Sequence, residues 1–458
     1  MTENDSPLIL GTGRIGSLLK SYALPAIIAM TASSLYHIVD SIFIGQGVGP
    51  LAIAGLALTF PLMNLAAAFG SLVGVGASTL IAVKLGQRDY EGANKALGNV
   101  CTLNILLGIS FSAVCLYFLT PILYFFGAGE QTLGYAREFM EIILMGNLVT
   151  HLYLGLNAVL RSSGHPRMAM YATLASVGIN CILNPLFIFG FGWGIRGSAW
   201  ATVISQVISL AWQLRHFADP KNLLHFRRGI YRLRKEFVRN MFAIGLSPFL
   251  MNLCASLIVL LINRGLKQYG GDMAIGAYGI VNRILFLFIM IVMGLNQGMQ
   301  PIAGYNFGAR RLDRVLGVTR LTIAWAVGVS LTGFLICQLF PAPIVRLFTS
   351  DAELIRISVE GLHIVFAVFP LVGFQMVATN FFLSVGMARE AIFLSLTRQL
   401  LFMLPCLVVL PRFFGIWGVW SSPPLSDLLA SILTAAMLFR QFRRFKKIPT
   451  LSPDKSTR

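Results

Sequence analysis

The chain contains little charge for its length. Only 12% of its 458 residues are charged, and 18 acidic residues stand against 36 basic ones. Soluble domains carry about 25% charged residues, so this composition excludes an ordinary soluble protein. Hydrophobic residues make up 56% of the chain. We therefore expect a protein with many membrane-spanning helices.

Cysteine pairs and catalytic motifs are also missing. The six cysteines are spread along apolar segments with no CxxC spacing, which predicts neither a disulfide framework nor a cysteine metal site. There is no phosphate-binding glycine loop, HExxH or GxSxG motif. We expect a secondary active transporter, not an enzyme or an ATP-driven pump, and no cofactor other than a coupling ion.

Apolar stretches recur from Leu18 to Phe439. Most have the roughly 20 residues that a helix needs to cross a bilayer. They predict an all-α integral membrane protein with twelve transmembrane helices. The expected spans are 18–44, 51–80, 96–120, 138–160, 168–190, 194–214, 240–263, 273–297, 316–340, 357–382, 390–411 and 415–439.

The basic residues are distributed unevenly between the connecting segments. With the N-terminus inside, 27 lysines and arginines lie on the cytoplasmic side and seven on the other. This bias is the positive-inside rule and predicts that both termini are cytoplasmic. The charge therefore encodes topology, and no nucleic-acid partner is expected. Residues 215–239 are expected to form a basic linker, either as an amphipathic helix on the inner leaflet or as a calmodulin-type binding segment. Residues 441–458 are expected to form a basic tail.

The second half of the sequence repeats the first. Matching residues are offset by 221 to 223 positions, which indicates an internal duplication. We expect an N-terminal six-helix lobe over 1–214 and a C-terminal six-helix lobe over 240–440. Six spans per half insert both halves the same way up, which predicts pseudo-two-fold symmetry along the membrane normal and a substrate path between the lobes. The matched pairs include Pro25 and Pro248, Asp40 and Asn263, Arg88 and Arg310, Gly164 and Gly386, and Gly194 and Gly415.

The first span carries a single acid, Asp40, on a polar stripe. Ser33, Tyr36, His37 and Asp40 follow i, i+3, i+4 and i+7 spacing and share one helix face. An intramembrane acid is a functional candidate by default, with a satisfied structural acid as the alternative. We predict that Asp40 is the coupling group. His37 either shuttles protons or forms a hydrogen bond between helices.

Other polar residues of the first half recur at helical spacing. Span five has Asn180 and Asn184, and span six has Ser198, Thr202 and Gln206. Span four adds Asn157. Their oxygens could bind Na⁺, or the groups could form a cage that tunes Asp40 for proton exchange. Bonds between helices are the third interpretation.

The second half is poorer in acids. Asp427 is a second coupling site, or it neutralises Arg283 or Arg398. Met251 and other soft or aromatic side chains would suit lipophilic guests. Pro25 and Pro248 should kink the first helix of each half, either as static kinks or as hinges.

Several motifs resemble the multidrug and toxic compound extrusion family, and its MepA-like branch in particular. The resemblance covers residues 14 to 440 and implies an antiporter that exports amphipathic, often cationic, drug-like compounds against H⁺, which we favour, or Na⁺. It implies a multi-pass protein of the bacterial cytoplasmic membrane, and the absence of a small-xxx-small dimer face favours a monomer. The motifs are VDSIFIGQGVGPLAIAGLALTFP at 39–61, VGVGASTLIAVKLGQ at 73–87, LRSSGHP at 160–166 and QGMQPIAGYNFGARR at 297–311.

The resemblance also implies roles for particular residues. Asp40 matches the acid of the family's first span, and Pro25 matches its bending proline. Asn180, Asn184 and Thr202 match its polar cluster, with Asn184 where some members have a second acid. Asn252 and Gln375 are neutral where some members use acids for Na⁺, which favours proton coupling. The alternative function is a lipid-linked precursor flippase, for which Arg283 and Arg398 are the only deep basic residues.

Overall fold

The computed structural model describes residues 9–447, except the side chains of His37 and Asp272. Within these residues every regular element is a helix. The chain forms two compact units. Unit 1 contains Ile28–Phe249, and unit 2 contains Leu10–Ile27 together with residues from Leu250 onward.

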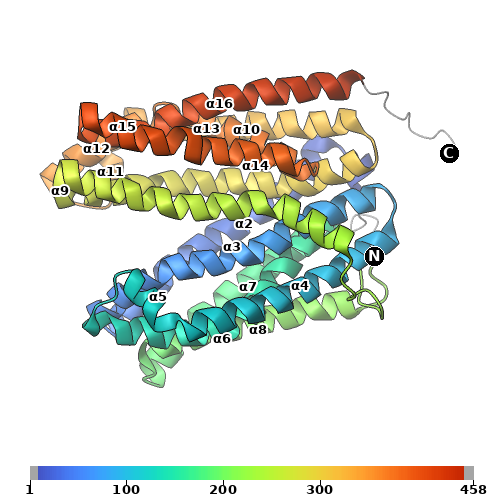
Figure 1. Cartoon of the computed structure of the whole chain (residues 1–458), viewed down its shortest axis with the longest axis horizontal. Helices are drawn as coiled ribbons and strands as arrows, with labels where there is room; N and C mark the ends of the chain where they lie inside the picture. The colour runs from blue at the N-terminus through green and yellow to red at the C-terminus, as the bar shows by residue number, and fades with distance from the viewer. Residues whose placement is uncertain (1–8, 448–458) are drawn as a thin grey trace. The chain divides into compact units, whose positions relative to one another are not determined.

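Unit 1 is built around α6, a long helix that packs against α3, α4 and α8 (Figure 1). Helix α7 lies along α8. This arrangement surrounds α6 with helices on several sides and buries Asn147, His151 and Asn157. The helices of this part of the chain are α2 (Ile15–Gly47), α3 (Pro50–Gly86), α4 (Tyr90–Tyr117), α5 (Leu119–Phe125), α6 (Glu130–Ser162), α7 (Pro166–Pro185), the π-helix η2 (Leu186–Gly190) and α8 (Gly194–Ala218).

Unit 2 is organised around α13 and α16. Helix α13 packs against α10 and α16, and α15 also packs against α16. The short α1 (Ile9–Thr12) precedes α2. The helices of the second half are α9 (Lys235–Gly308), α10 (Leu312–Leu339), α11 (Pro341–Arg346), α12 (Ala352–Phe366), α13 (Phe369–Ser384), α14 (Ala388–Leu396), the π-helix η3 (Thr397–Met403), α15 (Leu404–Phe414) and α16 (Ile416–Lys447).

The helices account for the twelve expected spans. In the described residues, ten helical segments are long and apolar enough to cross a membrane, with α9 counted as two because its backbone breaks at Gly271. Helices α12 and α13 form an eleventh span, bent by 49°. The less apolar α8 has 25 residues, about 37 Å of helix, and completes the set. The prediction of an all-α protein with six spans in each half is confirmed.

The duplication extends to the backbone. Arg88 and Arg310 are the two non-glycine residues with positive φ in the described chain, at 60° and 56°. A side chain in this left-handed conformation is uncommon. The matched pair Gly194 and Gly415 has φ of 57° and 56°. The same turns therefore follow corresponding helices in both halves.

The linker differs from the sequence prediction. Between α8 and α9 the chain forms no helix, so the prediction of an amphipathic helix there is wrong. Two asparagines of α4 hold the segment instead. Asn94 donates to the carbonyl of Leu223 at 3.1 Å and accepts from the backbone N–H of His225 at 3.0 Å. Asn99 accepts from the backbone N–H of Arg234 at 3.1 Å. These bonds satisfy linker backbone groups that a helix would satisfy internally.

Two helices of unit 1 cross closely at glycines. A Cβ atom added to Gly245 of α9 would lie 1.7 Å from the carbonyl oxygen of Leu72 in α3. One turn away, a Cβ on Gly76 would lie 2.0 Å from the carbonyl oxygen of Met241. Only glycine allows the two backbones to approach this closely.

Two prolines lie where the chain passes from one unit to the other. Pro25 is inside α2, and the assignment changes between Ile27 and Ile28. Pro248 is inside α9, and the assignment changes between Phe249 and Leu250. Proline removes one helical hydrogen bond and favours a bend. Each helix is thus weakened within three residues of the point where it changes unit.

Candidate functional site

Asp40 is buried inside unit 1 and held by neutral donors. Its side chain is 5% exposed. The hydroxyl of Ser198 donates to Oδ1 at 2.5 Å, and the amide of Asn184 donates to the same oxygen. Hydrogen bonds to a charged group are stronger than neutral ones, so these donors stabilise a carboxylate in an apolar setting. The acid that the sequence singled out therefore lies in a built polar site.

A second polar group lies one turn along α2 from Asp40. The hydroxyl of Tyr36 is 2.8 Å from Oγ1 of Thr202. The amide of Asn180 donates to Thr202 at 3.1 Å and to Tyr36 at 3.5 Å. Three helices, α2, α7 and α8, contribute to this group. The structure thus places all four residues predicted for cation coupling, together with Tyr36, in one cluster.

Local backbone features set the position of α7 and α8. Helix α7 ends at Pro185, directly after Asn184, and continues as the π-helix η2. A Cβ on Gly197 would lie 3.0 Å from the carbonyl carbon of Phe187. Glycine therefore lets α8 approach η2, and its neighbour Ser198 reaches Asp40. The sequence placed Ser198 among the polar residues of span six but did not identify it as a direct partner of Asp40.

The cluster offers hard oxygen atoms in addition to the carboxylate. Oδ1 of Asn184 is buried and has no hydrogen-bond partner in the described chain. No group of three or more His, Cys, Asp or Glu side chains that could hold a metal occurs among the described residues. Protonation of one carboxylate needs no such ligand set. A monovalent cation would instead depend on Asp40 with amide and hydroxyl oxygens.

Other predicted residues of unit 1 lie outside this cluster. Asn157 donates to the carbonyl of Ala169 at 2.9 Å and accepts from Arg161. Gln206 accepts from the hydroxyl of Thr150 at 2.5 Å. Both residues make bonds between or along helices and neither bonds to Asp40. The side chain of His37 lies outside the described residues.

In unit 2 the deep charged residues form an ion pair. Nε of Arg398 donates to Oδ1 of Asp427 at 2.7 Å, and both side chains are largely buried. Gln375 is buried and donates to Thr379 at 3.3 Å. Met251 is half-buried and Asn252 is exposed. Asp427 therefore lies beside a basic group, whereas Ser198 and Asn184, which donate to Asp40, are neutral.

Comparisons with known proteins agree with this architecture. The MatE family model matches residues 25–186 and 248–408, two segments that begin 223 residues apart. The chain is 30% identical to the multidrug export protein MepA of Staphylococcus aureus (strain N315) over 421 residues, 91% of each chain. It is 28% identical to the protein of the same name from Staphylococcus haemolyticus (strain JCSC1435), over 91% of this chain and 92% of that one.

Two solved structures show the same fold. The MATE multidrug transporter DinF-BH in complex with rhodamine 6G superposes with a TM-score of 0.88 at 35% identity, over 96% of this chain and 98% of that one. An outward-facing MATE family transporter of the MOP superfamily superposes with a TM-score of 0.91 at 23% identity, over 98% and 100%.

Proposed function

The chain belongs to the MatE family, whose members are secondary transporters, and we propose that it exports amphipathic, often cationic, compounds in exchange for protons. The chain is therefore a multi-pass membrane protein of a multidrug efflux family and not an enzyme. What we propose in addition is the coupling ion, the residue that binds it and the orientation in the membrane, with both termini in the cytoplasm.

The buried site of Asp40 carries the proposal. A carboxylate at membrane depth costs at least about 2.5 kcal/mol, so it needs a partner or a proton. Here the carboxylate has donors from Ser198 and Asn184. Such a group can bind a proton as the acid or balance a cationic compound as the anion. Because it cannot do both at once, occupancy by one ligand excludes the other, which is the requirement for antiport.

Bending of α2 and α9 supplies the conformational change in this proposal. Each helix begins in one unit and continues in the other, with Pro25 or Pro248 close to the change. A bend at these positions would alter access to the Asp40 cluster without unfolding either unit. The two units remain compact while the shared helices act as hinges.

The test is transport by purified protein in liposomes, with the compound in the DinF-BH complex, rhodamine 6G (hereafter rhodamine), as the probe. An imposed pH gradient should drive rhodamine export by the wild type, and Asp40→Asn should abolish export while rhodamine binding persists. Normal export by Asp40→Asn would overturn the proposal. A Na⁺ gradient without a pH gradient forms the second arm, and export driven only by Na⁺ would make the site a sodium site.

The flippase alternative is weakened by the ion pair in unit 2. A lipid-linked pyrophosphate requires several basic groups in the groove. Of the two deep arginines expected from the sequence, Arg398 is paired with Asp427. Translocation of a fluorescent lipid-linked phosphate by the same liposomes, without rhodamine export, would favour the flippase.

A further inference from the structure

A second stripe of polar residues continues from the Asp40 cluster along α8. Ser198, Thr202, Ser205 and Ser209 follow spacings of four, three and four residues, which places them on one helix face. Gln213 follows four residues later. All five side chains are at most 8% exposed. The stripe therefore runs inside unit 1 from Asp40 towards the end of α8 that joins the linker.

The facing side of α7 carries a matching stripe. Ser176 donates to Ser205 at 3.5 Å, one helical turn closer to the linker than the contact between Asn180 and Thr202. Further along, the hydroxyl of Tyr153 on α6 lies beside Ser176 and Thr173. Hydroxyl groups thus meet between α7 and α8 one turn beyond the Asp40 cluster, and between α6 and α7 further along.

The last residues of the α8 stripe have no protein partners. Oγ of Ser209 and both polar atoms of Gln213 are buried and make no hydrogen bond in the described chain. These residues are 1% and 0% exposed. Buried polar groups without protein partners are normally satisfied by ordered water, which needs a polar site of this kind. The unpaired atoms therefore indicate a hydrated segment between Ser205 and the linker end of unit 1.

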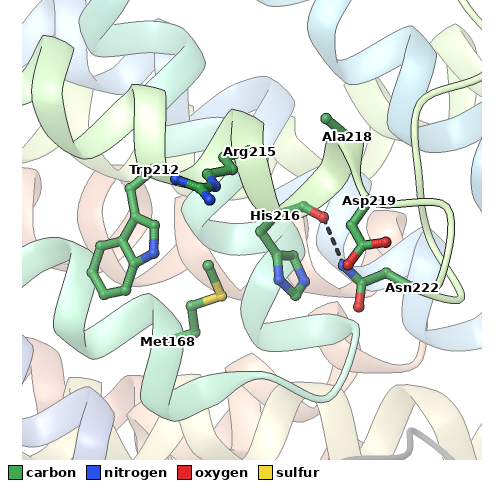
Figure 2. A pocket seen from close by; sticks show the side chains of 7 residues that line it. All are labelled: Met168, Trp212, Arg215, His216, Ala218, Asp219 and Asn222. Carbon is green, nitrogen blue, oxygen red and sulfur yellow. Dashed lines mark hydrogen bonds between the residues drawn. The ribbon is translucent and has the colours of Figure 1, made fainter. Parts of the chain in front are cut away.

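The stripe ends beside an open hollow of about 540 Å³ at the junction of α7, α8 and the linker. Figure 2 shows Met168 from α7 with Trp212 and His216 from α8 around this hollow. His216 lies seven residues after Ser209 and so on the same face. The charged or titratable groups at this end include Arg161, Arg167, Arg215, Asp219 and Lys221, and His165, which packs against His216 with 4.7 Å between ring centroids.

From this arrangement we infer that the coupling proton leaves Asp40 through unit 1, along the α8 stripe and its water, to the hollow at the linker end. The O–H bond of protonated Asp40 breaks, and each hydroxyl or water oxygen accepts one proton and releases another. The proton reaches bulk water at the hollow, and Asp40 is left as the carboxylate. Ser205, Ser209 and Gln213 are positioning residues for the water. The inference rests on the proposed role of Asp40.

The corresponding helix of unit 2 differs in the partner of its acid. Ser426, which matches Ser205, donates to the carbonyl of Arg398 at 2.9 Å, and the adjacent Asp427 is paired with that arginine. At the same offset of 221 residues, Ala430 stands where Ser209 stands in unit 1. The pair of Arg398 with Asp427 places a charged group beside the acid of that helix, whereas Ser198 and Asn184, which donate to Asp40, are neutral. We therefore place the route in unit 1.

The test is the double variant Ser209→Ala with Gln213→Leu, reconstituted in liposomes with a pH-sensitive dye inside. Replacing unpaired buried groups by apolar ones should maintain or raise the unfolding temperature. The movement of protons that rhodamine stimulates should fall at least tenfold, and so should the export of rhodamine. The affinity for rhodamine should stay within twofold of the wild-type value. The conservative double variant Ser209→Thr with Gln213→Asn should retain export. Ser330→Ala is the matched control, because Oγ of Ser330 is also buried and unpaired but lies in unit 2.

The outcomes separate this inference from the proposed function. Wild-type proton movement in the Ser209 and Gln213 double variant, with no export by Asp40→Asn, would overturn the exit route and leave the proposed function intact. Normal export by Asp40→Asn would overturn both. Equal loss of transport in Ser330→Ala would also contradict the route, because Ser330 shares with Ser209 only a buried, unpaired hydroxyl and lies outside the route.

Discussion

The side-chain amide of Asn184 on α7 donates to the carboxylate of Asp40 on α2, 144 residues away along the chain. We expect Asn184→Leu to lower rhodamine export about 10- to 100-fold, because a hydrogen bond to a charged group contributes about 1.5–3 kcal/mol. Initial export rates under a fixed pH gradient measure the effect. Asn104→Leu is the control, since both polar atoms of the buried Asn104 have no partner in the described chain. Equal rates for Asn184→Leu and the wild type would contradict a role for this bond.

Replacement of Pro25 tests the hinge in α2. Pro25→Ala restores a backbone donor and removes the cost of about 3 kcal/mol that proline imposes inside a helix. Export should fall at least tenfold while rhodamine binding and the unfolding temperature are maintained. Pro61→Ala is the control, because Pro61 lies inside α3 and far from any change of unit. A comparable loss in both variants would show that Pro25 has no special role in transport.

The ion pair between Arg398 and Asp427 gives a prediction for unit 2. Arg398→Met leaves the carboxylate of Asp427 largely buried without its cation and should reduce the free energy of unfolding by about 1–3 kcal/mol. The double variant with Asp427→Leu should recover most of that loss. Thermal unfolding in detergent measures both. Loss of export in Asp427→Asn at unchanged stability would instead identify Asp427 as a second coupling site.

The close crossing of α3 and α9 predicts that one added methyl group at Gly245 will lower the free energy of unfolding. Gly245→Ala places Cβ against the carbonyl oxygen of Leu72 and should destabilise unit 1 by about 1–3 kcal/mol. Gly279→Ala in the same long helix meets nothing within 4 Å. That control should be neutral or stabilising, since alanine is the better helix former by about 1 kcal/mol. Equal unfolding temperatures for the two variants would contradict the close contact.

The turn before α4 predicts a dependence of stability on pH. Oδ2 of Asp89 accepts from Nζ of Lys84 at 2.8 Å, and Oδ1 accepts from the backbone N–H of Gly92 at 2.8 Å. The bond from Lys84, followed by that from Gly92, holds the pKa of Asp89 below its ordinary value of 3.8. The stabilisation is therefore present above pH 3.8 and is lost as the pH falls through the lower folded pKa.

Asp89→Asn should accordingly unfold at a lower temperature than the wild type at about pH 6, by about 1 kcal/mol or less because the pair is partly exposed. The difference should shrink below pH 3.8. Lys84→Met should lower the unfolding temperature by a similar amount, since it removes the ion pair but retains the bond from the backbone N–H of Gly92 to Asp89. A deficit that is constant with pH would show that the ion pair contributes nothing.

The spans and the main site residues were predictable because both depend on local patterns. Apolar length identifies membrane helices, and i, i+4 spacing showed that Asn180 and Asn184 share a face. The sequence could not show that Ser198 reaches Asp40, because that contact depends on how closely α8 approaches η2 at Gly197. Nor could it show that Gln206 bonds to Thr150 on α6.

The conformation of the linker also could not be predicted from the sequence. Its basic residues suit an amphipathic helix on an anionic surface. The folded segment is set instead by side chains of Asn94 and Asn99, more than 120 residues earlier in the chain. Bonds of that sequence separation have no signature in a single sequence. The unpaired atoms of Ser209 and Gln213 are likewise visible only when the surrounding helices are in place.

The division of α2 and α9 between the units has a consequence for the history of the protein. Residues 10–27 belong with the second half of the chain, and the start of α9 up to Phe249 belongs with the first. A cut in the linker would therefore leave each fragment without a helical segment that its own unit requires. An ancestor with a single copy of the repeat would have completed its fold only by exchanging these segments between two chains.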